Sequence, residues 1–97
     1  MARVLYTESA QSDLLEAWLY IAEENPVAAD RVLDKIEQEA DGLSSRPLMG
    51  RARPELGTEV RAWPTSTPYI LFYRADDAGI VVLRVLHHAR DVQPIAF

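Results

Sequence analysis

Two adjacent histidines and a group of arginines are the side chains of this 97-residue sequence best suited to chemistry. Histidine gains and loses a proton near neutral pH, and arginine stabilises negative charge, so together they suit cleavage of a phosphodiester. The candidate acid and base are His87 and His88. The candidate phosphate-binding residues are Arg61, Arg74, Arg84 and Arg90. Arginines in such numbers equally suit a surface that attracts a charged partner.

A structural interpretation of the same residues competes with the catalytic one. Adjacent residues of a strand face opposite ways, so His87 and His88 are not expected to form a close pair. No third ligand follows at a suitable spacing, so the sequence predicts no metal site, and nothing in it indicates a cofactor. Arg90 followed by Asp91 is typical of a local ion pair or a turn anchor. We therefore predict no catalytic residue.

The elements that position these residues begin with an apolar run over 4–6 and an amphipathic helix over 8–23. Thr7 and Ser9 are its candidate caps, and apolar residues including Trp18 recur inside it at helical spacing. Asn25 and Pro26 then end one helix and start the next, because asparagine caps well and proline suits the first helical position. A connection this short predicts an antiparallel helix hairpin.

The second half of the chain predicts strands. Residues 44–58 are rich in serine, proline and glycine and predict a loop. Strand patterns follow at 59–63, 69–74 and 80–87, with a turn signal at 76–79. The sequence therefore predicts a two-layer α+β fold in a single domain over residues 1–97. It consists of an N-terminal strand, an antiparallel helix hairpin and a three-stranded antiparallel meander, in the order β-α-α-β-β-β.

The last strand presents two alternating sets of side chains. We assign one set to the helix-covered core, namely Val81, Leu83, Val85 and His87. The other set would lie on the second face of the sheet, namely Ile80, Val82, Arg84, Leu86 and His88. An apolar face edged by arginine is typical of a docking surface if it is open. The alternative is that the C-terminal tail covers these aliphatic residues and that Arg84 only extends along the surface.

Charge and composition narrow the class of protein. The net charge of −5 divides into −7 for residues 1–45 and +2 for residues 46–97. Proteins that bind nucleic acid directly usually carry a basic surplus, which this chain lacks. It has no cysteine and no apolar run of about 18 residues, so we expect a cytoplasmic protein without a membrane span. The acids of the second helix, Glu37, Glu39 and Asp41, are interpreted as a solvated face.

Several segments, taken in their order and spacing, resemble the ParE toxins of bacterial toxin–antitoxin modules, within the wider RelE/ParE group. They span the chain to about Val92 and comprise Tyr20–Pro26, Ala28–Ala29, Pro47, Met49–Arg51, Arg53–Gly57, Val60–Arg61, Tyr69–Arg74, Arg84–His87 and Ala89–Asp91. The resemblance implies the strand, helix hairpin and meander already predicted. It also implies a toxin that inhibits DNA gyrase and is neutralised by an antitoxin, whose C-terminal segment wraps around it.

The resemblance implies which partners would bind the candidate residues. We expect the antitoxin to contact Ile80, Val82, Arg84, Leu86, His88, Arg61 and Arg74. We expect the target to contact Arg51, Arg53, Trp63 and Arg90. The implied partners are the cognate antitoxin, in a hetero-oligomer, and DNA gyrase, with DNA reached only through the antitoxin.

Two alternative functions stay open. RelE-type relatives cleave messenger RNA on the ribosome, whereas this chain is acidic, has one lysine, and has no tyrosine or histidine in residues 93–97. We therefore favour a protein-binding inhibitor over an enzyme. The other alternative is a decayed toxin that now only binds the antitoxin.

Overall fold

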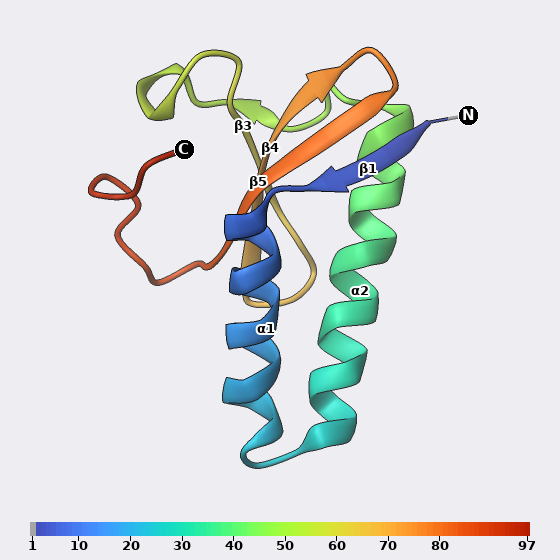
Figure 1. Cartoon of the computed structure of the whole chain (residues 1–97), viewed down its shortest axis with the longest axis vertical. Coiled ribbons are helices and arrows are strands. Elements are labelled where there is room, and N and C mark those ends of the chain that lie inside the picture. Colours follow the sequence, from blue (N-terminus) through green and yellow to red (C-terminus); the bar gives the residue numbers. More distant parts are fainter. Residues whose placement is uncertain (1) are drawn as a thin grey trace.

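The computed structural model describes residues 2–97 and confirms the predicted α+β architecture, with one added strand. The strands are β1 (Arg3–Tyr6), β2 (Arg51–Ala52), β3 (Arg61–Pro64), β4 (Tyr69–Asp76) and β5 (Gly79–His87). The helices are α1 (Glu8–Ala22), α2 (Pro26–Ser45) and the short 3-10 helix η1 (Pro54–Leu56). These strands form one sheet in the order β1-β5-β4-β3-β2, and the α1–α2 hairpin packs against it (Figure 1).

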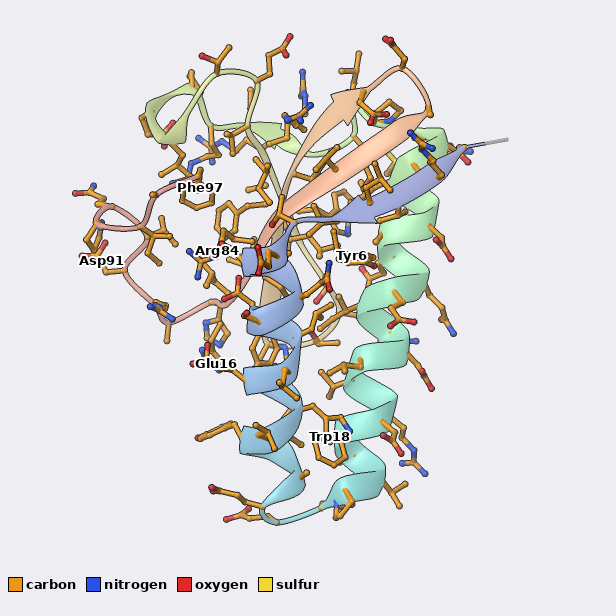
Figure 2. The ribbon with its side chains drawn as sticks, in the orientation of Figure 1. Tyr6, Glu16, Trp18, Arg84, Asp91 and Phe97 are labelled. Carbon is orange, nitrogen blue, oxygen red and sulfur yellow. The ribbon has the colours of Figure 1, made fainter. Side chains whose placement is uncertain are left out.

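Local capping starts both helices where the sequence predicts. The Thr7 hydroxyl accepts a hydrogen bond from the Ala10 amide at 3.1 Å, and the Asn25 side chain accepts one from the Ala28 amide at 3.1 Å. Trp18, one of the apolar residues at helical spacing that would be expected in the core, is only half-buried. Its indole nitrogen donates to Asp30 of α2 at 2.9 Å, so Trp18 ties the two helices together (Figure 2).

The predicted loop over residues 44–58 is more ordered than the sequence indicates. Helix α2 continues to Ser45, and β2 pairs antiparallel with β3. The antiparallel meander therefore has four strands, β2 to β5, instead of three. A two-residue strand is too short to show an alternating pattern in the sequence. Strand β2 is therefore recognised only from its pairing with β3.

Strand β1 joins the sheet at its other edge, parallel to β5, with Arg3 paired to Gly79 and Tyr6 to Val82. Gly79 has φ of +154°, and a Cβ placed on it would collide with the Arg3 backbone. Glycine is therefore required for β1 to approach β5 this closely.

A β-bulge in β5 corrects the predicted assignment of its faces. Phe72 pairs with Arg84 and Tyr73 with Val82, so Leu83 is an extra residue in β5. An extra residue inverts the alternation on one side of it. The outward placement of Ile80 and Val82 is wrong, because both are fully buried in the helix-covered core. The core placement of Leu83 is also wrong, because it packs in the cluster on the second face.

The second face of the sheet is covered by the chain's own tail, as the alternative interpretation held. Its buried residues are Val60, Ala62, Phe72 and Leu86. The tail residues packed on them are Val92, Ile95 and Phe97. The Phe97 ring meets Phe72 edge-on, with centroids 5.0 Å apart. The apolar surface expected to be open for docking is therefore largely closed within this chain.

The length and apolar content of the helices can be compared with what a membrane span requires. Within residues 2–97, neither helix combines the length and the apolar content needed to cross a bilayer.

Candidate functional site

Arg84 is held by a buried carboxylate of α1 and does not point freely from the sheet. Its Nε and Nη2 donate to the two carboxylate oxygens of Asp13 at 2.7 and 2.8 Å. The Asp13 side chain is only 3% exposed and that of Arg84 18%. Hydrogen bonding to the Asp13 carboxylate raises the pKa of the Arg84 guanidinium above its ordinary value. Arg84, expected to contact the antitoxin, is therefore an internal partner of α1.

The same carboxylate helps to close the edge of β5. Strand β1 ends at Tyr6 opposite Val82, and β5 continues beyond it without a strand neighbour on that side. The Thr7 hydroxyl donates to the Leu83 carbonyl at 2.8 Å, and the Val85 amide donates to Asp13 at 3.0 Å. Thr7 and Asp13 thus satisfy two of the backbone groups that an added strand would need at this edge.

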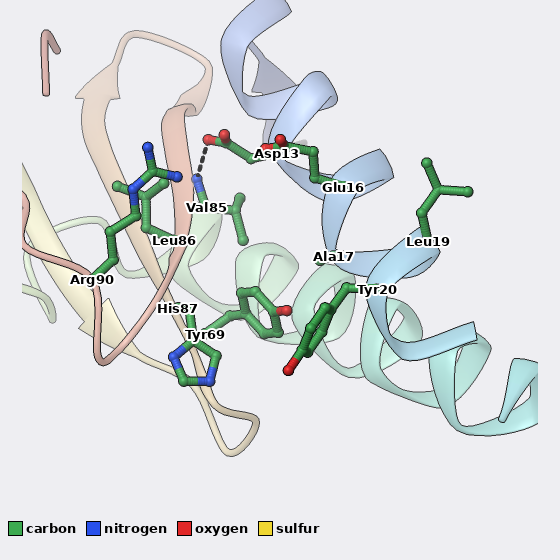
Figure 3. Close-up of a pocket in the computed structure, with 10 residues that line it drawn as sticks. All are labelled: Asp13, Glu16, Ala17, Leu19, Tyr20, Tyr69, Val85, Leu86, His87 and Arg90. Carbon is green, nitrogen blue, oxygen red and sulfur yellow. Dashed lines mark hydrogen bonds between the residues drawn. The ribbon is translucent and has the colours of Figure 1, made fainter. Parts of the chain in front are cut away.

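A groove of about 460 Å³ lies between α1, the end of β5 and the first residues of the tail (Figure 3). It is lined by Asp13, Glu16, Ala17, Leu19, Tyr20, Tyr69, Val85, Leu86, His87 and Arg90. Ala17, Tyr69, Val85 and Leu86 are buried and supply a mainly apolar floor. Glu16 and Arg90 are exposed and lie on opposite sides of the groove. An open groove with an apolar floor and charged sides suits a peptide segment.

Three large side chains of α1 continue the apolar character of the groove outward. Leu15, Leu19 and Tyr20 are 59%, 52% and 71% exposed. Leu15 and Leu19 are four residues apart and so lie on one side of the helix. We call these three residues the α1 ridge. Exposed leucines gathered beside a groove are typical of a protein-binding surface.

The two histidines form a close pair, so the prediction that they would face opposite ways is wrong. Their rings are stacked with centroids 4.5 Å apart. Strand β5 ends at His87, so His88 lies in a turn and does not alternate to the opposite face. The Nδ1 atom of His87 accepts from the Ala89 amide at 3.1 Å, and the His87 ring meets Tyr69 edge-on. His88, expected to contact the antitoxin, is exposed beside the groove but does not line it.

The remaining arginines are spread over the sheet and its loops. Arg61 is half-buried and donates to the carbonyls of Leu48 and Gly50, so it supports the loop before β2. Arg53 pairs with Glu55 at 2.7 Å. Arg51 and Arg74 are exposed on β2 and β4. The residues expected to contact the antitoxin therefore do not gather in one patch. Nor do the residues expected to contact the target.

Trp63 and Glu39 form a polar connection between β3 and α2. The Trp63 indole donates to the Glu39 carboxylate at 3.1 Å, and the Ser66 amide and hydroxyl donate to it at 2.9 and 2.8 Å. Trp63, expected to contact the target, packs at the side of the helix-covered core. The interpretation of Glu39 as a solvated acid is wrong. Partial burial raises the pKa of its carboxyl, but the hydrogen bonds from Ser66 and Trp63 bring that pKa below its ordinary value of 4.5.

This lowered pKa predicts a loss of stability in acid. A carboxyl whose pKa is lower in the folded chain favours folding above its unfolded pKa, and this contribution disappears as the pH falls below about 4.5. Urea unfolding of the wild type and Glu39→Gln should therefore show a larger stability difference at pH 7 than at pH 3.5. Glu24→Gln, at an exposed position, is the matched control. A pH-independent difference for Glu39→Gln would contradict the prediction.

The chemistry of the groove is suited to recognition. Residues 2–97 contain no group of three acidic or histidine side chains placed to hold a metal ion. Leu86 and Arg90 are the members of the expected partner sites that line the groove. Glu16 and the α1 ridge were not predicted from the sequence. Leu15 and Leu19 carried a readable signal, because they form an apolar pair at i, i+4 outside the main helical stripe.

Comparisons with known proteins agree with this fold. A family model described as the ParE toxin of the type II toxin–antitoxin system parDE matches residues 4–92. The chain is 32% identical over 90 residues to Toxin RelE2 of Caulobacter vibrioides, covering 93% of this chain and 99% of that protein. It is also similar to a chain of the solved chromosomal ParDE TA system from P. aeruginosa. That match has a TM-score of 0.73 at 22% identity and covers 90% of this chain and 96% of that one.

Proposed function

Because this chain belongs to the ParE toxin family of type II toxin–antitoxin systems, we propose that it inhibits DNA gyrase and is neutralised by a wrapping antitoxin. On this proposal the toxin acts in the cytoplasm by binding other proteins. It contacts DNA only through the antitoxin, with which it forms a hetero-oligomer.

The observation that carries this proposal is that three of the candidate catalytic side chains, those of Arg84, Arg61 and His87, bond within the fold. Arg84 is paired with Asp13, and Arg61 donates to two carbonyls. The Nδ1 atom of His87 accepts from a backbone amide. Catalysis of phosphodiester cleavage requires an acid, a base and cations that converge on the substrate. Occupied side chains beside an exposed apolar ridge favour inhibition by binding.

Gyrase supercoiling tests the proposal directly. Purified toxin added to gyrase and relaxed plasmid should reduce supercoiling in a dose-dependent manner. Toxin mixed first with an equimolar amount of the antitoxin encoded beside it should leave supercoiling intact. Full supercoiling at saturating toxin would overturn the gyrase proposal.

One feature of the groove favours a second candidate function, ribosome-dependent cleavage of messenger RNA. Glu16, His87 and Arg90 line the same groove, which therefore presents a carboxylate, an imidazole and a guanidinium on one surface. Primer extension on translated message should then show cleavage by the wild type and none by His87→Gln. An intact message with the wild type would remove this candidate.

A further inference from the structure

The turn between α2 and β2 presents two large apolar side chains to solvent, and we propose that it inserts into an apolar recess bordered by carboxylates on the folded protein that the toxin inhibits. The two side chains are Leu48 and Met49, which are 69% and 51% exposed. We call residues 46–51 the apolar turn; none of them lines the groove beside α1. The inference rests on the proposed inhibition of gyrase and adds which surface of the toxin makes the contact.

Side chains of the sheet fix the backbone of the apolar turn. The hydroxyl of the buried Tyr73 accepts a hydrogen bond from the Gly50 amide at 2.8 Å and donates one to the Pro47 carbonyl at 2.8 Å. Arg61 donates to the carbonyls of Leu48 and Gly50 at 3.3 and 2.8 Å. A Cβ placed on Gly50 would collide with the Tyr73 ring, so glycine allows the turn to lie this close. The apolar side chains are therefore held outward on an ordered backbone.

The apolar surface extends from the turn on both sides. Met49 lines a hollow of about 490 Å³ along α2, together with the buried Leu43 and the half-buried Trp63. Leu48 lines a smaller hollow of about 150 Å³ that includes the buried Val60. Exposed apolar residues that gather on one surface mark a site of protein binding. Two large apolar side chains at the centre of such a surface are suited to supply most of the binding energy.

The shape and order of the apolar turn decide which kind of partner it fits. A flexible segment that wraps around the toxin binds best in a groove, where it buries its side chains in pockets. An exposed turn requires the reverse arrangement, a recess that already exists in a folded protein. Because its backbone is already ordered, the turn loses little conformational entropy when it enters such a recess. The apolar turn is therefore assigned to the target and not to the antitoxin.

The charges beside the turn determine the charge of the recess. Arg46 and Arg51 are the first and last residues of the apolar turn, and both are exposed. Within residues 2–97 neither of them forms a salt bridge, whereas Arg53 is paired with Glu55. Glu59 lines the hollow beside Leu48, so the surface around the turn is net positive. Carboxylates at the border of the recess would complement Arg46 and Arg51.

Substitution of the two apolar residues measures the contact in the gyrase supercoiling assay. Leu48→Glu and Met49→Glu should each raise the toxin concentration for half-inhibition about tenfold or more, because a carboxylate replaces an apolar anchor. Val27→Glu is the matched control, since Val27 is 60% exposed and lies at the other end of α2, a helix of 20 residues that is roughly 30 Å long. It should inhibit like the wild type. All three variants should bind the antitoxin encoded beside the toxin as tightly as the wild type, which checks their folding.

Charge reversal measures the electrostatic part of the contact. Arg46→Glu and Arg51→Glu should each weaken binding to immobilised gyrase severalfold and reduce its dependence on salt, since salt screens attraction between surface charges. Arg46→Lys and Arg51→Lys keep the charge and should bind nearly as tightly as the wild type. Equal affinity and equal salt dependence for the wild type and the two glutamate variants would overturn the charge assigned to the recess.

Growth arrest on expression of the toxin alone separates this inference from the function on which it rests. If the wild type arrests growth without inhibiting gyrase, and Leu48→Glu and Met49→Glu do not arrest it, the gyrase proposal falls and the apolar turn stands. If both variants inhibit gyrase or arrest growth as well as the wild type, the turn is not the contact with the target. If the variants lose antitoxin binding and keep inhibition, the surface serves the antitoxin and the inference is overturned.

Discussion

Replacing Asp13 by alanine is expected to destabilise the fold by about 3–5 kcal/mol, the usual cost of removing one partner of a buried ion pair. The carboxylate accepts three hydrogen bonds, two from Arg84 and one from the Val85 amide. Its removal leaves a half-buried guanidinium and a buried amide without partners, and it opens the wall of the groove. Urea unfolding followed by circular dichroism measures the loss.

The matched control for Asp13 is Asp30→Ala. Asp30 is exposed and accepts one hydrogen bond, from the Trp18 indole, so its removal should cost no more than about 1 kcal/mol. Asp13→Asn should fall between the two, because the amide keeps one acceptor but places a donor against Arg84. Equal free energies of unfolding for Asp13→Ala and Asp30→Ala would contradict the prediction that the buried Asp13–Arg84 ion pair stabilises the fold.

Replacing Gly79 by alanine is expected to cost about 2–4 kcal/mol, through backbone strain and a steric collision that act together. Its φ of +154° is a conformation that residues with a Cβ rarely adopt, and the added methyl group would meet the Arg3 backbone. The chain would have to move β1 away from β5, exposing the core beneath. The same unfolding experiment gives the magnitude, and amide exchange at Leu5 and Thr7 should rise.

Gly42→Ala is a control that is expected to change the stability of the fold in the opposite direction. Gly42 lies inside α2, and a Cβ there would meet nothing within 4 Å. Alanine should therefore stabilise the protein by about 0.5–1 kcal/mol, since glycine weakens a helix interior. A stabilising Gly79→Ala or a destabilising Gly42→Ala would contradict the structural account of these glycines.

Local signals sufficed to predict most of the elements. The caps Thr7 and Asn25 each bond to an amide three residues ahead, so the sequence near them contains the whole interaction. The turn before β5 is equally local, because the Asp76 carboxylate accepts from the Ala78 amide. Strand β2 escaped prediction because it consists of two residues and depends on β3.

The candidate site was predicted only in part. Leu86 and Arg90 were predicted to contact separate partners, and both line one groove. Arg61 and Arg84 were expected to contact the antitoxin, and in the structure both bond within the fold. An arginine in a sequence carries no sign of whether its partner is a carbonyl, a carboxylate or another protein, since the partner is distant along the chain.

The sequence by itself determined the order of the two long helices and the longer strands, the helix hairpin, the acidic first half and the resemblance to ParE toxins. Each of these depends on neighbouring residues or on their order. The tertiary structure alone decided which side chains of β5 face the helices, because the bulge at Leu83 arises from pairing with β4. It also decided that Asp13, 71 residues from Arg84, closes the sheet edge, and that Phe97 covers Phe72. Contacts between distant segments depend on how packed layers meet, and such geometry leaves no local pattern in the chain.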